Sequence, residues 1–172
     1  MDKRIAEHIL KWHYECDLDF IKLLSFINEN KIPIADSKLI NALGMATYYK
    51  IHLDIDHIEF QPHKLRYFII LHEIAHYKRL QKKGLDYHLS KLSSDNLKDV
   101  YEHIILEELI ADRYAMKTFH TLIKEYYPYE ETQRINDYGN KIKFMSSANA
   151  LMGVLENNED SYKKMINNHI ML

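Results

Sequence analysis

The segment between Pro62 and Gly84 constrains the fold most, because its apolar residues lie on more than one side of a predicted helix. The helical period begins after Pro62, continues over residues 64–83 and ends at Gly84, a residue typical of the position just after a helix. Apolar residues fall on two sides of this helix: Leu65, Ile69 and Leu80 on one, Ile70 and Ile74 on the other. A helix that is apolar all round is buried. The rest of the chain therefore has to pack around it.

Two histidines interrupt one apolar side of this predicted helix. His72 and His76 are one turn apart, so both imidazoles can reach the same ion. Imidazoles in the middle of an apolar stripe need a polar partner or a metal. Together with Glu73 they form the pattern H-E-x-x-H, which is typical of catalytic zinc sites. The alternative is a pair of core histidines held by hydrogen bonds alone.

Zinc chemistry assigns different roles to the three polar residues of this motif. Zinc binds neutral imidazole nitrogens at about 2.0–2.1 Å and prefers four tetrahedral ligands. Glu73 points about 100° away from His72 around the helix, so we do not expect it to be a ligand. It can still reach a water molecule at an open coordination position and take its proton. Glu73 is therefore the predicted catalytic base.

A second predicted helix, from residue 99 into the 120s, offers a third ligand. Its apolar face is made of Tyr101, Ile104, Ala111, Ala115, Phe119 and Leu122. Glu108 lies at the centre of that face, where an ionised glutamate is costly unless it is paired or binds a metal. Glu107 is offset by about 100° and is expected to be a solvated or salt-bridged flank residue. We predict one Zn²⁺ per chain, held by His72, His76 and Glu108.

Further polar residues would support this site. Asp112 follows Glu108 by one turn and is expected to accept a hydrogen bond from the second ring N–H of a ligand histidine. Its alternative role is a surface charge that pairs with Arg113 or Lys117. A donor is also needed for the oxyanion of the tetrahedral intermediate. The candidates are His103, Tyr101, Tyr114 and His88.

The remaining pattern predicts an α+β fold that is mostly helical. Residues 3–14 and a following segment that ends near Asn30 have helical spacing. Residues 51–56 alternate apolar and polar, which predicts a strand with one buried and one solvated face. We expect this strand to belong to a small antiparallel sheet and to pair with an extended substrate. His52, His57 and His63 match no ligand spacing, so no second metal site is expected among them.

One zincin-like domain over residues 1–172 is the expected organisation. Its parts would be N-terminal helices over 1–40, a metal-site core over 41–124 and C-terminal helices over 125–172. Hydrophobic residues make up 47% and charged residues 28%, the balance of a folded soluble protein rather than a disordered one. Four glycines and three prolines favour helices over a sandwich of many turns.

Charge and apolar runs exclude several classes of partner. The formal net charge is only −2, which does not favour binding to nucleic acid or to a membrane surface. The longest apolar stretch near the centre, residues 67–71, is too short to cross a bilayer. The single cysteine, Cys16, cannot form an internal disulfide. We expect a cytoplasmic protein that acts on a protein substrate.

The order of the motifs resembles the ImmA/IrrE family of zinc metallopeptidases, which are gluzincin-like zincins. The resemblance rests on Leu43-Gly44-Met45-Ala46, on the aromatic and apolar run of residues 66–71 into H-E-x-x-H, and on the E-x-x-A-D helix of residues 108–115. It covers about residues 40–120. It implies a zinc-dependent endopeptidase that performs limited proteolysis of a regulatory protein, such as a DNA-binding helix-turn-helix repressor of a mobile element or stress response.

The rival interpretation is a catalytically silent, zinc-containing binding protein that sequesters a regulator. Such a protein would keep the same fold, whether stabilised by zinc or metal-free. Glu73 favours the enzyme, because a structural zinc site has no need of a carboxylate next to its histidines.

Overall fold

The computed structural model describes residues 1–40, 42–95 and 97–125. The chain divides into two units, residues 1–85 with 110–127 and residues 86–109 with 128–172. Helix α6 (Leu97–Ile123) is continuous across the division. The C-terminal helices expected over 125–172 lie almost wholly outside the described residues. That expectation, and the expectation of a single domain, stay predictions.

The first unit begins with two helices at the places that the apolar spacing predicts. They are α1 (Lys3–Glu15) and α2 (Phe20–Glu29), and they pack against each other. Each helix begins after an aspartate, Asp2 or Asp19, whose side chain accepts a hydrogen bond from a backbone N–H of the first turn. Such a cap satisfies one of the donors that a helix N-terminus leaves over.

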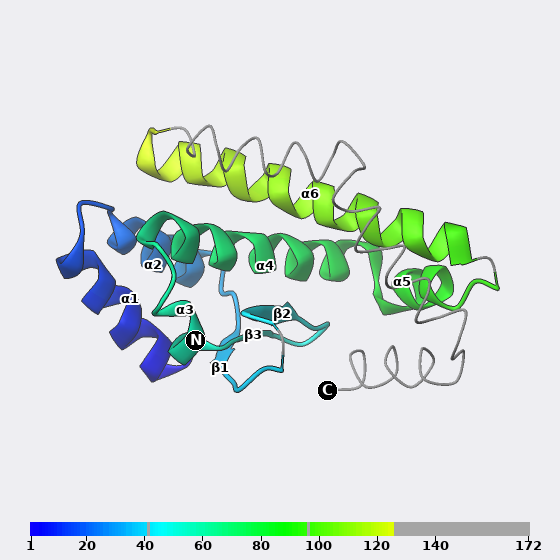
Figure 1. Ribbon diagram of the computed structural model, residues 1–172, viewed down its shortest axis with the longest axis horizontal. Coiled ribbons are helices and arrows are strands. Elements are labelled where there is room, and N and C mark those ends of the chain that lie inside the picture. The colour runs from blue at the N-terminus through cyan, green and yellow to red at the C-terminus, as the bar shows by residue number, and fades with distance from the viewer. Residues whose placement is uncertain (41, 96, 126–172) are drawn as a thin grey trace. The chain divides into compact units, whose positions relative to one another are not determined.

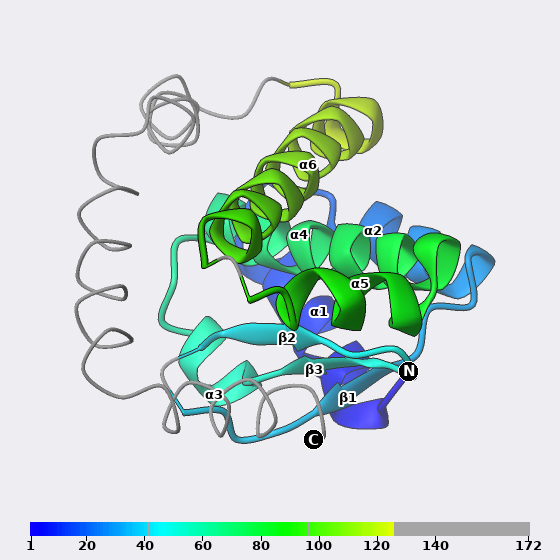
Figure 2. The ribbon, with the colours of Figure 1, turned by 90° about the vertical axis from the view of Figure 1, so that its right-hand side faces the viewer.

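A three-stranded sheet follows, made of β1 (Ile34–Asp36), β2 (Gly44–Ala46) and β3 (Ile51–Leu53). The strand order is β1-β3-β2, with β1 parallel and β2 antiparallel to β3. The sheet is therefore mixed, and the expectation of an antiparallel sheet was wrong. Since β3 is paired on both sides, a substrate cannot add to it as a strand, contrary to the expectation for residues 51–56. Strand β2, at one end of the strand order, lies beside α4 (Figure 2).

The predicted strand over 51–56 ends after three residues because Asp54 caps a short helix, α3 (Ile55–Ile58). Its side chain accepts hydrogen bonds from the backbone N–H groups of His57, at 3.2 Å, and Leu39, at 3.0 Å. Asp54 is 2% exposed, so it does not lie on a solvated face. Burial alone would raise the pKa of Asp54, but the hydrogen bonds from Leu39 and His57 outweigh it and lower that pKa.

Helix α4 (His63–Lys83) lies across the sheet, in contact with β2 and β3 (Figure 1). It ends at Gly84, which has a φ of 84° and donates its backbone N–H to the carbonyl of Leu80. A positive φ is costly for a residue with a Cβ, so glycine suits this helix end. The predicted bounds of this helix are confirmed to within one residue.

A chain of aromatic rings forms the centre of the first unit. Trp12 of α1 contacts Phe20 of α2 with ring centroids 5.7 Å apart, and Phe20 contacts Tyr67 of α4 at 5.1 Å. Tyr67 in turn meets Phe119 of α6 edge to face at 5.2 Å. All four side chains are fully buried. Large rings in these arrangements stabilise a core by area and by quadrupole geometry, so they hold α4 against three other helices.

The second unit is described over residues 86–109. It contains most of α5 (Leu85–Leu92), in a segment whose sequence pattern was ambiguous, and the first half of α6. Across the residues that the structure describes, no helix has the length and apolar character needed to cross a membrane.

Candidate metal centre

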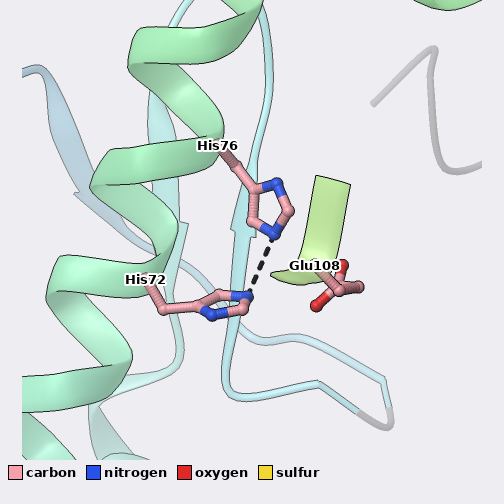
Figure 3. A group of neighbouring side chains, drawn as sticks. All are labelled: His72, His76 and Glu108. Atoms are coloured by element: carbon pink, nitrogen blue, oxygen red, sulfur yellow. Dashed lines mark hydrogen bonds between the residues drawn. The ribbon is translucent and has the colours of Figure 1, made fainter. Parts of the chain in front are cut away.

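His72 and His76 project from the same side of α4 toward one point (Figure 3). Their Nε2 atoms are 3.0 Å apart, and their ring planes are inclined by 72°. Two nitrogens bound to one tetrahedral zinc ion would be about 3.3 Å apart, from bonds of about 2.0–2.1 Å. The observed separation is close to that value. The helical spacing therefore brings the two nitrogens together as the sequence predicts.

Asp112 of α6 determines which nitrogen of His72 is available. His72 Nδ1 lies 2.8 Å from Asp112 Oδ1, and a carboxylate only accepts hydrogen bonds, so Nδ1 carries the proton. In a neutral ring Nε2 is then the atom with a lone pair, and Nε2 is the atom that faces His76. This is the arrangement that orients a metal-binding histidine. Asp112 is thus buried against His72, the contact expected of it if His72 binds a metal, rather than on the surface.

Glu108 completes the group. It precedes Asp112 by one turn of helix α6. One ligand atom each from His72, His76 and Glu108 lies within 4.8 Å of the others (Figure 3). Two imidazole nitrogens and a carboxylate oxygen are suitable donors for zinc and leave one tetrahedral position open. All three residues are partly exposed, so water can reach that position.

The Glu73 side chain of α4 lies against Gly44 of strand β2. A Cβ atom at Gly44 would stand 2.5 Å from Glu73 Cγ, 2.9 Å from Cδ and 3.0 Å from Oε1. Real Cβ contacts do not reach the shortest of these distances. The glycine therefore leaves room for the Glu73 side chain between helix and strand. The sequence pointed to Gly44 only as part of a motif and gave no reason for it.

The candidate oxyanion donors whose side chains are described have different surroundings. The ring of Tyr114 lies against Lys78, whose Nζ is 5.6 Å from the ring centroid. The side chain of Tyr101 lies outside the described residues. His103 and His88 lie together in the second unit, with ring centroids 5.4 Å apart. No described contact assigns an oxyanion donor.

His52, His57 and His63 each lie near a different partner. His52 Nδ1 is 2.8 Å from Ser37 Oγ, and His57 Nδ1 is 2.9 Å from Asp54 Oδ2. His63 is nearest to a carboxylate oxygen of Glu15, at 4.0 Å. Burial, with a smaller effect of the Lys50 charge, lowers the pKa of His52.

A second His/Glu group was not predicted. Among the described residues, ligand atoms of His88, His103 and Glu107 also lie within 4.8 Å of one another. Glu107 is buried, so it is not a solvated flank residue, but its Oε1 lies 3.9 Å from His103 Nδ1, within the range of the salt-bridged alternative. The spacing of His103 and Glu107, four residues apart on one helix, is visible in the sequence. The approach of His88 from another helix is not.

Fold and site together define a mostly helical α+β chain with His/Glu groups able to hold a metal ion. Comparison with models of known protein families, with curated proteins and with solved structures finds no match. The function therefore has to be argued from the chemistry of these residues.

Proposed function

We propose that this chain is a zinc-dependent endopeptidase, with a metal site of His72, His76 and Glu108 and with Glu73 as the catalytic base. The observation that carries the proposal is the joint placement of these residues. Three ligand atoms lie within 4.8 Å of one another, and Glu73, which is not one of them, comes from the same turn of α4. A structural site would need the ligands alone.

The donor set fits a catalytic zinc ion on two grounds. First, His72 Nδ1 donates its hydrogen to Asp112, so the lone pair of the ring is on Nε2, where it can bind the metal. Second, three protein ligands and partial exposure are typical of catalytic sites, whereas structural sites are closed by four. A zinc ion held there would lower the pKa of a bound water molecule and polarise the scissile carbonyl.

The residues of the chain supply the remaining chemistry. Glu73 takes the proton of the attacking water and later delivers it to the leaving amine, a role worth about 10²–10⁴-fold in rate. Gly44 leaves the space in which the Glu73 carboxylate sits. Asp112 holds the His72 ring in the orientation that the metal site needs.

Strand β2 is the element best suited to bind an extended peptide. It stands at the end of the strand order and contains Gly44, the residue against Glu73. A strand at the end of a sheet offers backbone groups to an added strand. A peptide paired with β2 would therefore run past the catalytic base. This replaces β3 as the strand for substrate addition.

The substrate class follows from the family resemblance and not from the geometry. The motifs resemble those of ImmA/IrrE peptidases, which implies one regulatory protein, such as a DNA-binding repressor, as the target. We expect cleavage in one exposed or locally unfolded segment of that protein. Digestion of casein into many fragments at a comparable rate would contradict this substrate class.

The deciding experiment compares wild type with Glu73→Gln. The amide keeps the size of the side chain but cannot accept the proton from water, so the variant should bind zinc, fold normally and lose nearly all proteolysis. Cleavage is measured in cells that co-express regulators encoded beside the gene, and zinc is measured on the purified chains. Glu7→Gln, at an exposed residue of α1 that pairs with Lys3, is the matched control.

The same variant separates the enzyme from the binding protein that sequesters a regulator. A sequestering protein would keep its cellular effect after Glu73→Gln, because its ligands and surface are unchanged. An enzyme would lose the effect together with the cleavage product. Survival of the full cellular effect without any cleavage would overturn the proposal.

A further inference from the structure

The second unit contains a buried group of His88, His103 and Glu107. His88 comes from α5, and the other two residues come from successive turns of α6. One ligand atom of each lies within 4.8 Å of the others, and each residue is only 8% exposed. The group thus has the donor types of a zinc site in a place that solvent hardly reaches.

The ligand atoms of this group lie somewhat farther apart than ligands around a zinc ion do. His103 Nδ1 and Glu107 Oε1 are 3.9 Å apart, which is beyond hydrogen-bonding distance for that pair of atoms. Two ligand atoms on a tetrahedral zinc ion would be about 3.3 Å apart. A small change of side-chain torsion would bring the two atoms to that separation. The ring of His88 is inclined by 48° to that of His103 and approaches from the neighbouring helix.

Charge gives a second reason. A buried carboxylate is costly unless a positive charge lies near it. A divalent cation bound to all three side chains would supply that charge. The competing source of positive charge is a protonated His103, whose Nδ1 lies 3.9 Å from Glu107 Oε1. An ion pair between these two residues would not require His88 to approach them. The convergence of three donors favours the cation.

We propose that His88, His103 and Glu107 bind a second zinc ion, which fastens α5 to α6. The role is structural, because the group is buried while the first group is partly exposed, and a water molecule would take the fourth position that three side chains leave. Consecutive glutamates on a helix point about 100° apart. Glu107 and Glu108 can therefore serve two different groups. The proposal does not depend on peptidase activity, and it raises the expected zinc content from one to two ions per chain.

Zinc content of five purified chains tests the proposal. Wild type should hold two zinc ions, His76→Ala one, His88→Leu one and the double variant none, as measured by plasma mass spectrometry after dialysis. His120→Leu, another histidine of α6 outside both groups, should hold two. Unchanged zinc content in His88→Leu, or a metal-free His76→Ala chain, would overturn the second site.

The pattern also separates failure of this site from failure of the first. If only the second site exists, wild type holds one ion, His76→Ala still holds one and His88→Leu holds none. If only the first exists, His88→Leu matches wild type and His76→Ala is empty. Each result identifies which group binds zinc.

A stability measurement covers the case in which His88→Leu does not fold. In the His76→Ala chain only the second site remains, so a chelator should lower its Tm and added zinc should restore it. Glu107→Gln in that background keeps the side-chain size but removes the charge, and should remove both the zinc and the chelator effect. A Tm that does not respond to chelator in the folded His76→Ala chain would refute the site.

Discussion

Gly44 and Glu73 are in such close contact that a Cβ atom on residue 44 would lie only 2.5 Å from Glu73 Cγ. The contact joins strand β2 to helix α4, and no side chain larger than hydrogen fits at residue 44 without displacing the glutamate. It makes Gly44 a positioning residue for the proposed base.

Gly44→Ala should therefore lower the rate of proteolysis while zinc content stays at the wild-type value. A displacement of about 1 Å at a catalytic group can cost about 10²-fold in rate. The three heavy atoms nearest to the added methyl group all belong to Glu73, so the glutamate is the side chain that has to move. The measurement is kcat together with the zinc content of the same preparation.

Gly84→Ala is the matched control for that variant. Gly84 has a φ of 84° and nothing within 4 Å of its hypothetical Cβ. Alanine there should cost about 1 kcal/mol of stability through the strained backbone and leave kcat unchanged. Equal activity of the two alanine variants would mean that Gly44 does not position Glu73.

Glu108→Ala should weaken zinc binding at the His72–His76 site far more than Glu107→Ala does. Removing a residue that is hydrogen-bonded to a metal ligand typically lowers metal affinity by about 10–100-fold, and the loss on removing Glu108 itself should be larger. Zinc titration is best carried out in the His88→Leu background, where only this site remains. A larger loss with Glu107→Ala would exchange the roles of the two glutamates.

Asp112→Ala should lower zinc affinity at the first site by about 10–100-fold, because His72 loses the acceptor that holds its tautomer and ring orientation. Competition with a chelator of known affinity measures the change. Asp99→Ala, at an exposed position of the same helix, is the control and should have no effect. An unchanged zinc affinity in Asp112→Ala would mean that the contact between Asp112 and His72 contributes to packing and not to metal binding.

Asp54 should make stability depend on pH in the acid range. Its folded pKa lies below the unfolded value of about 3.9, because of the hydrogen bonds from Leu39 and His57. The stabilisation is therefore complete above the unfolded pKa and is lost as pH falls through the folded pKa. Asp54→Asn should lower the free energy of unfolding at pH 7 by about 1–3 kcal/mol and flatten its acid dependence.

Denaturant unfolding between pH 7 and pH 3, with chelator present to exclude metal effects, checks this prediction. Asp17→Asn, at an exposed residue between α1 and α2, is the control and should keep the wild-type dependence on pH. Parallel curves for wild type and Asp54→Asn would show that the buried cap does not couple to protons.

The sequence alone was sufficient for the features that depend on local spacing. Helix α4 and its end at Gly84 follow from apolar periodicity and from the freedom of glycine. The proximity of His72 to His76 follows from the four-residue repeat of a helix. These quantities belong to one helix at a time, so they can be read without a fold. The expected burial of Glu108 does not follow in this way: Glu108 is partly exposed, and Glu107 is the buried glutamate.

Tertiary structure decided whatever depends on segments distant in the chain. Strand β3 became the centre of a mixed sheet because β1 pairs with it from one side and β2 from the other, which alternation within residues 51–56 cannot encode. Asp54 became a buried cap because Leu39 and His57 offer it N–H donors. The physical reason is the same in these cases. A contact between distant segments stabilises the protein only after both segments have folded, whereas apolar periodicity depends on the residues of one segment alone.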